Sequence, residues 1–215
     1  MPLRLALALL ALLAAACAPA DTLSTKSYTS SQPPMRWDHR PEAAGWTEAA
    51  LAALGGHGAV LERLEPADVA RFCPGYPDAG PEARRAFWAG LFSALAKHES
   101  TWRPDAAGGG GRWLGLLQIA PATARGYGCR ARSADALFDG TANLSCGVRI
   151  AARQVARDNE IVGGPGRWRG LARDWAPFRS AAKVEDMAAW TRAQPYCRKP
   201  APAGPLERLM TATTR

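Results

Sequence analysis

The feature that most constrains the fold is an apolar stretch from Pro81 to Glu99 with the pattern of a buried helix. A proline suits the first turn of a helix, and large apolar side chains then recur at the spacing of a single helical stripe. Pro104 and the glycines at 108–111 prevent this helix from continuing. The sequence therefore predicts a buried helix that ends at a carboxylate and is followed at once by a loop.

The periodicity of the rest of the chain is also helical. No alternation of apolar and polar residues extends beyond four positions, so the expected fold class is mainly α, with little or no β-structure. A further long helix should begin at a cap formed by Asp139 or Thr141. The other expected helices are Glu48–Leu54 (capped by Thr47), Val60–Leu64, a helix from Pro66 to near Cys73, Pro121–Gly126 and Val184–Gln194.

The first residues are typical of an export signal. Arg4 precedes an apolar run at 5–16 that is too short to span a bilayer. Residues 18–20 fit an ordinary signal peptidase site, whereas the small residues before Cys17 resemble a lipoprotein box, although its leucine stands one place early. We favour lipidation of Cys17, because this cysteine otherwise has no evident role. The expected location is the periplasm, with the lipid anchored in the outer membrane.

Composition divides the remainder of the chain. A stretch rich in Ser, Thr and Pro follows the signal, and its lack of apolar periodicity indicates a flexible linker. The expected divisions are a signal peptide at 1–17, a linker at 18–45, a helical extension at 46–80, the main domain at 81–198 and a tail at 199–215.

Four cysteines remain in an exported chain, and an even number in an oxidising compartment indicates disulfides. Four cysteines allow three pairings. We expect Cys129–Cys146, which closes a short loop, and Cys73–Cys197, which joins the two flanks, each contributing about 3 kcal/mol. The cysteines show no CxxC spacing and no accompanying histidine cluster, so no metal site is expected.

The formal net charge of +8 suits an anionic polymer or a membrane surface. Nucleic acid would suit this charge equally, but no helix-turn-helix, RNP or zinc-finger pattern is present, so we expect no nucleic-acid partner. The glycines at 108–111 are not followed by Lys-Ser/Thr, and no dinucleotide fingerprint occurs. We therefore expect no cofactor, and we expect a monomer.

Three short motifs occur in order in the middle of the chain: Glu99-Ser100, then Gly115-Leu116-Leu117-Gln118-Ile119, then Asn143-Leu144-Ser145-Cys146-Gly147. This series resembles the lytic transglycosylases of the soluble lytic transglycosylase type, which are lysozyme-like and related to the goose-type enzymes. The flanks at 34–80 and 157–215 match that family less clearly. The resemblance implies a lysozyme-like helical domain whose partner is the glycan strands of peptidoglycan.

The resemblance also implies a chemistry centred on Glu99. In that family one glutamate acts first as acid and then as base, and the bond between N-acetylmuramic acid and N-acetylglucosamine is cleaved with formation of a 1,6-anhydro product. A general acid must keep its proton near neutral pH, and burial among apolar groups raises a carboxyl pKa. Assistance by the substrate removes the need for a second carboxylate. The nearest such group in sequence, Asp105, lies in a loop with no special setting.

Several polar and aromatic residues are candidates for binding the sugar. Gln118 offers both a donor and an acceptor, suited to an acetamide or a hydroxyl, or it is an ordinary buried amide. Each of the others also has a structural alternative, either packing or the pairing of backbone groups. The remaining candidates are Ser100, Trp102, Trp113, Tyr127 and Asn143.

The chain departs from the family at one place. The family carries a later Ala-Tyr-Asn motif whose tyrosine hydrogen-bonds the catalytic glutamate, and the counterpart here, residues 171–175, contains no tyrosine. Trp175, Tyr127 or Tyr196 are candidates to replace it. Two alternatives therefore stay open: a hydrolytic lysozyme (muramidase), and a peptidoglycan-binding envelope protein without catalytic activity.

Overall fold

The computed structural model describes residues 32–164 and 166–199. The predicted signal segment, the lipidation candidate Cys17 and the predicted tail after Lys199 lie outside these residues. In the described part of the chain, no helix is long and apolar enough to cross a membrane.

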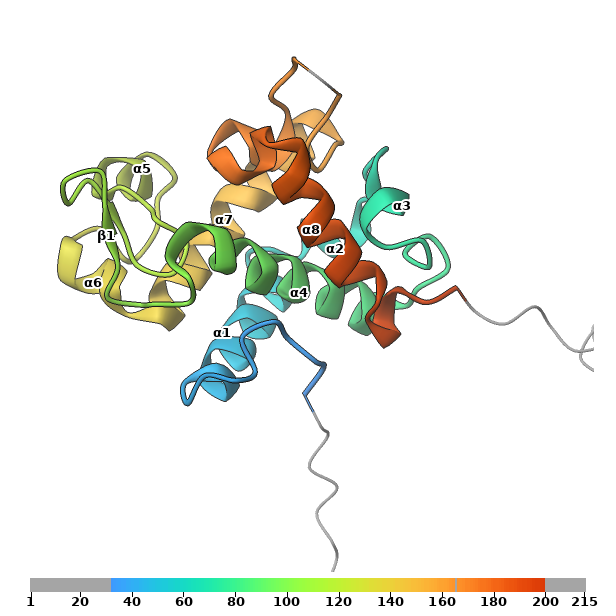
Figure 1. Cartoon of the computed structure of the whole chain (residues 1–215), viewed down its shortest axis with the longest axis horizontal. Coiled ribbons are helices and arrows are strands. Elements are labelled where there is room, and N and C mark those ends of the chain that lie inside the picture. Colours follow the sequence, from blue (N-terminus) through green and yellow to red (C-terminus); the bar gives the residue numbers. More distant parts are fainter. Residues whose placement is uncertain (1–31, 165, 200–215) are drawn as a thin grey trace, which may run out of the picture. The chain divides into compact units, whose positions relative to one another are not determined.

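The described residues are mainly helical, which confirms the predicted fold class (Figure 1). The only strands among them are β1 (Ala107–Gly108) and β2 (Trp113–Leu114), which pair antiparallel with Ala107 opposite Leu114. The α-helices are α1 (Ala43–Gly55), α2 (Val60–Arg63), α3 (Val69–Phe72), α4 (Pro81–Ser100), α5 (Pro121–Gly126), α6 (Ala134–Phe138), α7 (Gly140–Asp158) and α8 (Ala181–Arg192). Three short 3₁₀ helices are η1 (Gly170–Arg173), η2 (Ala176–Arg179) and η3 (Pro195–Cys197).

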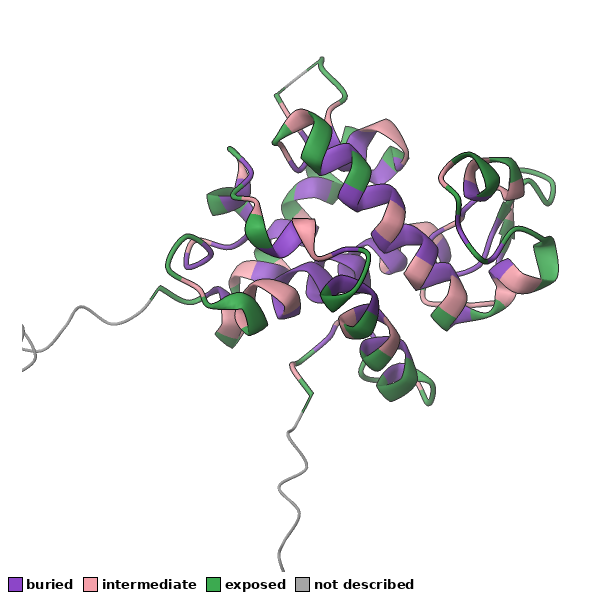
Figure 2. Ribbon diagram, turned by 180° about the vertical axis from the view of Figure 1, so that it is seen from behind, coloured by how far each residue is buried: buried purple, intermediate pink, exposed green. Residues whose placement is uncertain are grey.

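Helix α4 lies at the centre of the core, as its apolar sequence predicts. Every residue from Ala86 to Ala96 is buried, and α4 packs against α1, α2 and α8 (Figure 2). Pro81 lies in the first turn, where a backbone N–H has no hydrogen-bond partner within the helix, so the lack of this group in proline costs nothing. A helix covered on this many sides holds its last turn, and therefore Glu99, in a fixed position.

Helix α7 begins at the cap that its sequence predicts. The Asp139 carboxylate accepts hydrogen bonds from the backbone N–H groups of Thr141 and Ala142, at 2.8 and 3.1 Å. These bonds satisfy two N–H groups that have no partner inside the helix, so Asp139 is the cap and Thr141 is not. The predicted inner stripe of α7 is buried: Leu144, Val148, Ala151, Ala152 and Val155.

The predicted linker extends too far along the chain. Met35 and Trp37 lie inside the predicted linker, yet they are 4% and 0% exposed and belong to the core. Helix α1 likewise begins at Ala43 rather than at Glu48. Thr47 is not a helix cap; it lies within α1, donating to the Ala43 carbonyl and accepting from the Trp37 indole N–H. An isolated tryptophan between prolines and charged residues carries no periodic signal. The composition of this segment therefore could not show that Trp37 belongs to the core.

Two disulfides join distant parts of the fold, and they are the pairs expected from the sequence. Cys73, which follows α3, is bonded to Cys197 in η3. Cys129, after α5, is bonded to Cys146 in α7. The second disulfide fixes the α5 segment against the helix whose N-terminal half supports the candidate site.

Candidate active site

Helix α4 ends abruptly one residue after Glu99. Thr101 adopts the left-handed conformation (φ 53°), and its N–H donates to the Lys97 carbonyl, while the Trp102 N–H donates to the Ala96 carbonyl. This is how a helix satisfies its last carbonyls while the chain turns away. Glu99 is left on the final turn with its carboxyl group facing the loop that returns.

Two buried polar side chains hold that returning loop. The Ser100 hydroxyl donates to the Leu116 carbonyl at 2.9 Å. The Asn143 side chain accepts from the Leu117 N–H and donates to the Leu114 and Leu137 carbonyls, each at 2.9 Å. The three sequence motifs therefore meet in space. Ser100 and Asn143 are 6% and 0% exposed, so they support the loop from below and present no surface to a sugar.

Glycine at position 115 is required by the geometry of this loop. Its φ is +74°, and a Cβ atom there would lie 2.1 Å from the Leu137 carbonyl oxygen and 2.4 Å from the Asn143 Nδ2. Gln118 also has a positive φ (48°), and together with Thr101 and Trp102 it makes three of the four described non-glycine residues of this kind. Backbone strain is thus concentrated beside Glu99, as is common at functional sites.

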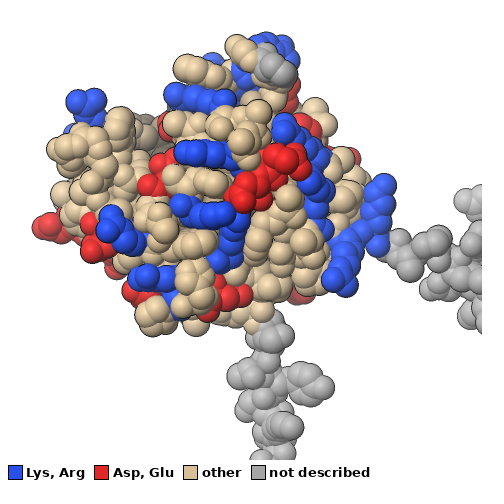
Figure 3. Space-filling model, viewed as in Figure 1, with Lys and Arg blue, Asp and Glu red and all other residues tan. Residues whose placement is uncertain are grey.

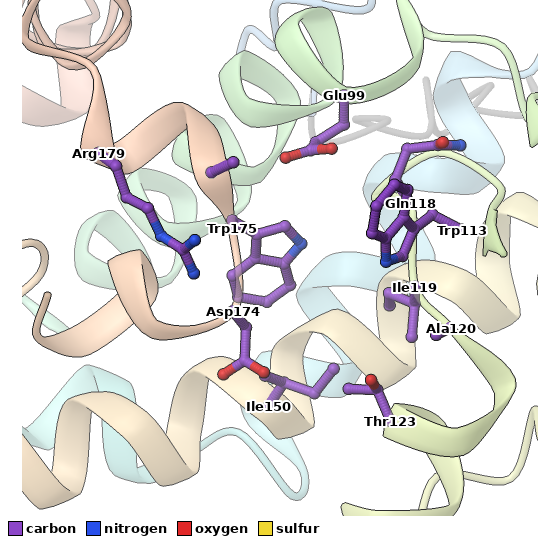
Figure 4. Close-up of a pocket in the computed structure, with 11 residues that line it drawn as sticks. Glu99, Trp113, Gln118, Ile119, Ala120, Thr123, Ile150, Asp174, Trp175 and Arg179 are labelled. Atoms are coloured by element: carbon purple, nitrogen blue, oxygen red, sulfur yellow. The ribbon is translucent and has the colours of Figure 1, made fainter. Parts of the chain in front are cut away.

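Glu99 opens into a cavity of about 440 Å³. Figure 4 shows its carboxyl group pointing into this space, with Arg179 on one side and Gln118 and Trp113 on the other. The cavity is lined by Glu99, Trp113, Gln118, Ile119, Ala120, Thr123, Ile150, Asp174, Trp175, Ala176 and Arg179.

The surroundings of Glu99 favour its protonated form. Burial raises its pKa from 4.5 to about 7, because the charged form loses hydration, while Lys183 and Arg179 act weakly in the opposite direction. Within residues 32–164 and 166–199, no group hydrogen-bonds the Glu99 carboxyl group. The two positive charges therefore offset only part of the cost of ionising Glu99, and it can hold a proton near neutral pH.

None of the three residues considered as replacements for the missing tyrosine reaches Glu99. The Trp175 indole N–H donates to the Leu117 carbonyl at 2.9 Å, and the Tyr127 hydroxyl donates to Asp174 at 3.0 Å. The Tyr196 hydroxyl donates to the Pro34 carbonyl. Trp175 instead lines the same cavity as Glu99 and makes no hydrogen bond to its carboxyl group.

The structure separates the six candidate sugar-binding residues into groups. Gln118 and Trp113 line the cavity, and the Gln118 amide is held by the Ala106 and Gly115 carbonyls. Tyr127 lies in an adjoining hollow and not beside Glu99. Trp102 does not line the cavity, because its indole N–H donates to the Ser93 carbonyl of α4.

Sequence reasoning missed two charged residues of the cavity, Asp174 and Arg179. Asp174 accepts hydrogen bonds from Tyr127 and from Gln154, the latter at 2.6 Å. Arg179 is fixed by donating to the carbonyls of Ala172 and Arg173, each at 2.8 Å. Both lie more than 70 residues from Glu99 in the sequence, and no local pattern distinguishes them from surface charges. Among the described residues, no group of three or more His, Cys, Asp or Glu side chains could hold a metal ion.

The raised pKa of Glu99 predicts a stability effect that depends on pH. The pKa of Glu99 rises from 4.5 in the unfolded chain to about 7 in the folded protein. The free energy of unfolding is therefore greatest below pH 4.5 and decreases as the pH rises from 4.5 through 7. At about 1.4 kcal/mol per pKa unit, E99Q should stabilise the protein by about 3 kcal/mol at pH 8. At pH 4 its effect should be small. Urea unfolding of both proteins at the two pH values measures this, and an equal effect at both would contradict the assignment.

Comparison with known proteins places the chain in a family. The profile described as "Transglycosylase SLT domain" matches residues 79–169. Solved structures of Bd0314 DslA are also similar to this chain. A glutamate-to-glutamine mutant of that protein is 31% identical with a TM-score of 0.71, and the match covers 77% of this chain and 98% of the DslA chain. The wild-type form 2 matches at 30% identity with a TM-score of 0.70, covering 78% and 99%. No curated protein matches the chain.

The chain belongs to the SLT transglycosylase family and has its lysozyme-like helical fold, as the sequence motifs predict. It is a lytic transglycosylase that acts on peptidoglycan.

Proposed function

We propose that the chain cleaves the β-1,4 bond between N-acetylmuramic acid and N-acetylglucosamine and closes the muramic residue into its 1,6-anhydro form. The observation that carries this proposal is the Glu99 carboxyl group, which faces the cavity with a pKa raised to about 7 and no hydrogen-bond partner in the described chain. Such a group can give up a proton and take one back at the same pH.

The proposed reaction uses Glu99 twice. Its proton passes to the bridging oxygen, which leaves as the 4-hydroxyl of N-acetylglucosamine while the bond to C1 of the muramic residue breaks. The substrate's acetamido oxygen stabilises the positive charge at C1. The Glu99 carboxylate then accepts the proton of the 6-hydroxyl as that oxygen bonds to C1. Glu99 ends protonated, no water is consumed, and the product is one water lighter than a hydrolytic one.

Hydrolysis is the second candidate reaction, and the position of Asp174 favours it. Asp174 is the other carboxylate lining the Glu99 cavity, and Tyr127 and Gln154 fix its orientation. Two carboxylates across a sugar ring are the usual arrangement for hydrolysis. Mass spectrometry of the muropeptides released from purified peptidoglycan decides between the two: anhydro products support the proposal, and reducing-end products alone overturn it in favour of a lysozyme.

Trp113 should contribute to binding without taking part in the chemistry. It is 45% exposed, lines the cavity and is flanked by Arg112, whose guanidinium lies 5.6 Å from the ring centroid. An open aromatic face beside the acid suits stacking on a sugar ring. Trp113→Ala should raise KM about tenfold with little change in kcat, because uniform binding is lost. Trp113→Phe keeps the face and should retain most of the affinity; equal losses in both variants would exclude stacking.

We also propose that the chain is exported and anchored through a lipid on Cys17, which follows the apolar segment at 5–16. A lipid-modified chain partitions with membranes. Cys17→Ala should move the protein to the soluble fraction of lysed cells, and an unchanged distribution would overturn the anchor.

A further inference from the structure

A second hollow lies next to the Glu99 cavity and is bordered by positive charge. Its volume is about 330 Å³, and its charged lining residues are Arg71, Arg167 and Arg179, with no Asp or Glu among the described residues that line it. Arg179 also lines the Glu99 cavity, so the two hollows share a wall. Figure 3 shows groups of Lys and Arg side chains at the upper edge of the molecule and in the region of α8, where Asp and Glu side chains lie beside them.

Trp168 presents an aromatic surface in this hollow. It is 59% exposed, and only Trp113 is also a large exposed apolar residue in the described chain. The Arg179 guanidinium lies over the Trp168 ring at 4.1 Å from its centroid. Because two backbone carbonyls fix Arg179, the stack holds the indole in place beside the shared wall. An exposed tryptophan held in this way offers a fixed apolar surface on which a ligand can pack.

The other two arginines have weak acidic partners. The nearest carboxylate oxygen lies 3.8 Å from Arg71 (on Glu185) and 4.0 Å from Arg167 (on Glu160). Both distances exceed that of a charge-assisted hydrogen bond. The two guanidinium groups can therefore bind an added carboxylate without first breaking a close ion pair.

We propose that the Trp168 hollow, defined by Trp168, Arg71, Arg167 and Arg179, binds a carboxylate-bearing branch of the peptidoglycan strand being cleaved at Glu99. Trp168 packs on the apolar part of the branch, and the arginines bind its carboxylate. This inference rests on the proposed function. Because Arg179 lines both the hollow and the Glu99 cavity, a branch bound in the hollow and the bond cleaved at Glu99 can belong to the same strand. The carboxylate belongs either to a peptide stem or to the lactyl group of a strand without stems.

The test measures binding in an E99Q background, where cleavage does not interfere. Three ligands are compared at 150 mM salt: soluble strands with peptide stems, strands without stems, and stem-bearing strands whose carboxylates have been amidated. The paired variant R71Q and R167Q should weaken binding of carboxylate-bearing strands about tenfold or more. Binding of amidated strands should not change. W168A should weaken binding of both charged and amidated stem-bearing strands.

A matched control removes the same charge elsewhere. R63Q combined with R130Q alters two exposed arginines that line neither the Glu99 cavity nor the Trp168 hollow, and it should change affinity less than twofold. A loss confined to stem-bearing strands identifies the peptide stem as the ligand, and a loss confined to strands without stems identifies the lactyl carboxylate, which is free only where the stem is absent. A loss with both natural strands means that the hollow binds a carboxylate from either source. Equal losses for the two arginine pairs, or equal affinity of the E99Q protein for amidated and natural strands, would overturn the proposal.

The product analysis described above is independent of this result. A protein that binds as expected but releases no anhydro product would contradict the proposed reaction and not the Trp168 hollow. Anhydro products from a protein whose binding ignores carboxylates would contradict the hollow alone.

Discussion

E99Q is expected to lower the rate of peptidoglycan cleavage by about 10³-fold, because glutamine keeps the shape of the side chain and has no proton to transfer. Glu99 faces the cavity from a rigid helix end, so the substitution should leave the fold intact. The measurement is the initial rate of release of soluble fragments from purified peptidoglycan at pH 6.5. Affinity for uncleaved strands should be retained, which separates loss of chemistry from loss of binding.

Asp105 provides the matched control. It is an exposed carboxylate six residues further along the chain that does not line the cavity, so D105N should leave the cleavage rate within about twofold of wild type. If E99Q and the wild-type protein degraded peptidoglycan at the same rate, Glu99 could not be the acid. If D105N were as inactive as E99Q, the assignment to a single carboxyl group would fail.

The second large effect is expected at Asn143, which is fully buried and pairs three backbone groups of the surrounding loops. Asn143→Ala leaves the Leu117 N–H and the Leu114 and Leu137 carbonyls without partners in a dry site. Each orphaned group costs about 1–3 kcal/mol, so we expect a loss of about 4 kcal/mol in the free energy of unfolding. Urea unfolding with the disulfides intact measures this loss.

Ser145 is a suitable control for Asn143. It lies one helical half-turn further along α7, is partly exposed, and its hydroxyl makes no hydrogen bond within the described residues. Ser145→Ala should change the free energy of unfolding by less than about 0.5 kcal/mol. A similarly small effect of Asn143→Ala would mean that the amide does not hold the loop, and the role of support given to Asn143 would be wrong.

Most helices that carry an explicit boundary signal could be predicted, but the helix expected to begin at Pro66 begins at Val69. Pro81, Pro121 and Asp139 each determine a helix start through a property of that residue alone, and the observed starts agree. Helix α6 (Ala134–Phe138) was not predicted, because five residues are too few to show a period. The early start of α1 was missed for a different reason: the residue before it, Glu42, makes no side-chain capping hydrogen bond, so no local signal marks the start.

The candidate site was predictable only in part. Glu99 and Gln118 follow from motifs, because the helix end and the returning loop are close in sequence. The packing of η1 and η2 places three further residues at the site, so their role depends on the fold: Asp174, Trp175 and Arg179. The motif residues Ser100 and Asn143 show the converse: their positions mark the site, but their side chains bond to backbone groups beneath it.

The proposed reaction depends most on the proton of Glu99, and the pKa of this side chain can be measured directly. Carbon-13 NMR titration of the side-chain carboxyl groups, with the Glu99 signal assigned by its absence from E99Q, follows ionisation at this one position. Burial without a compensating hydrogen bond predicts a midpoint near pH 7. A midpoint near 4.5, the ordinary value for glutamate, would mean that Glu99 is ionised at neutral pH and would contradict its role as the acid.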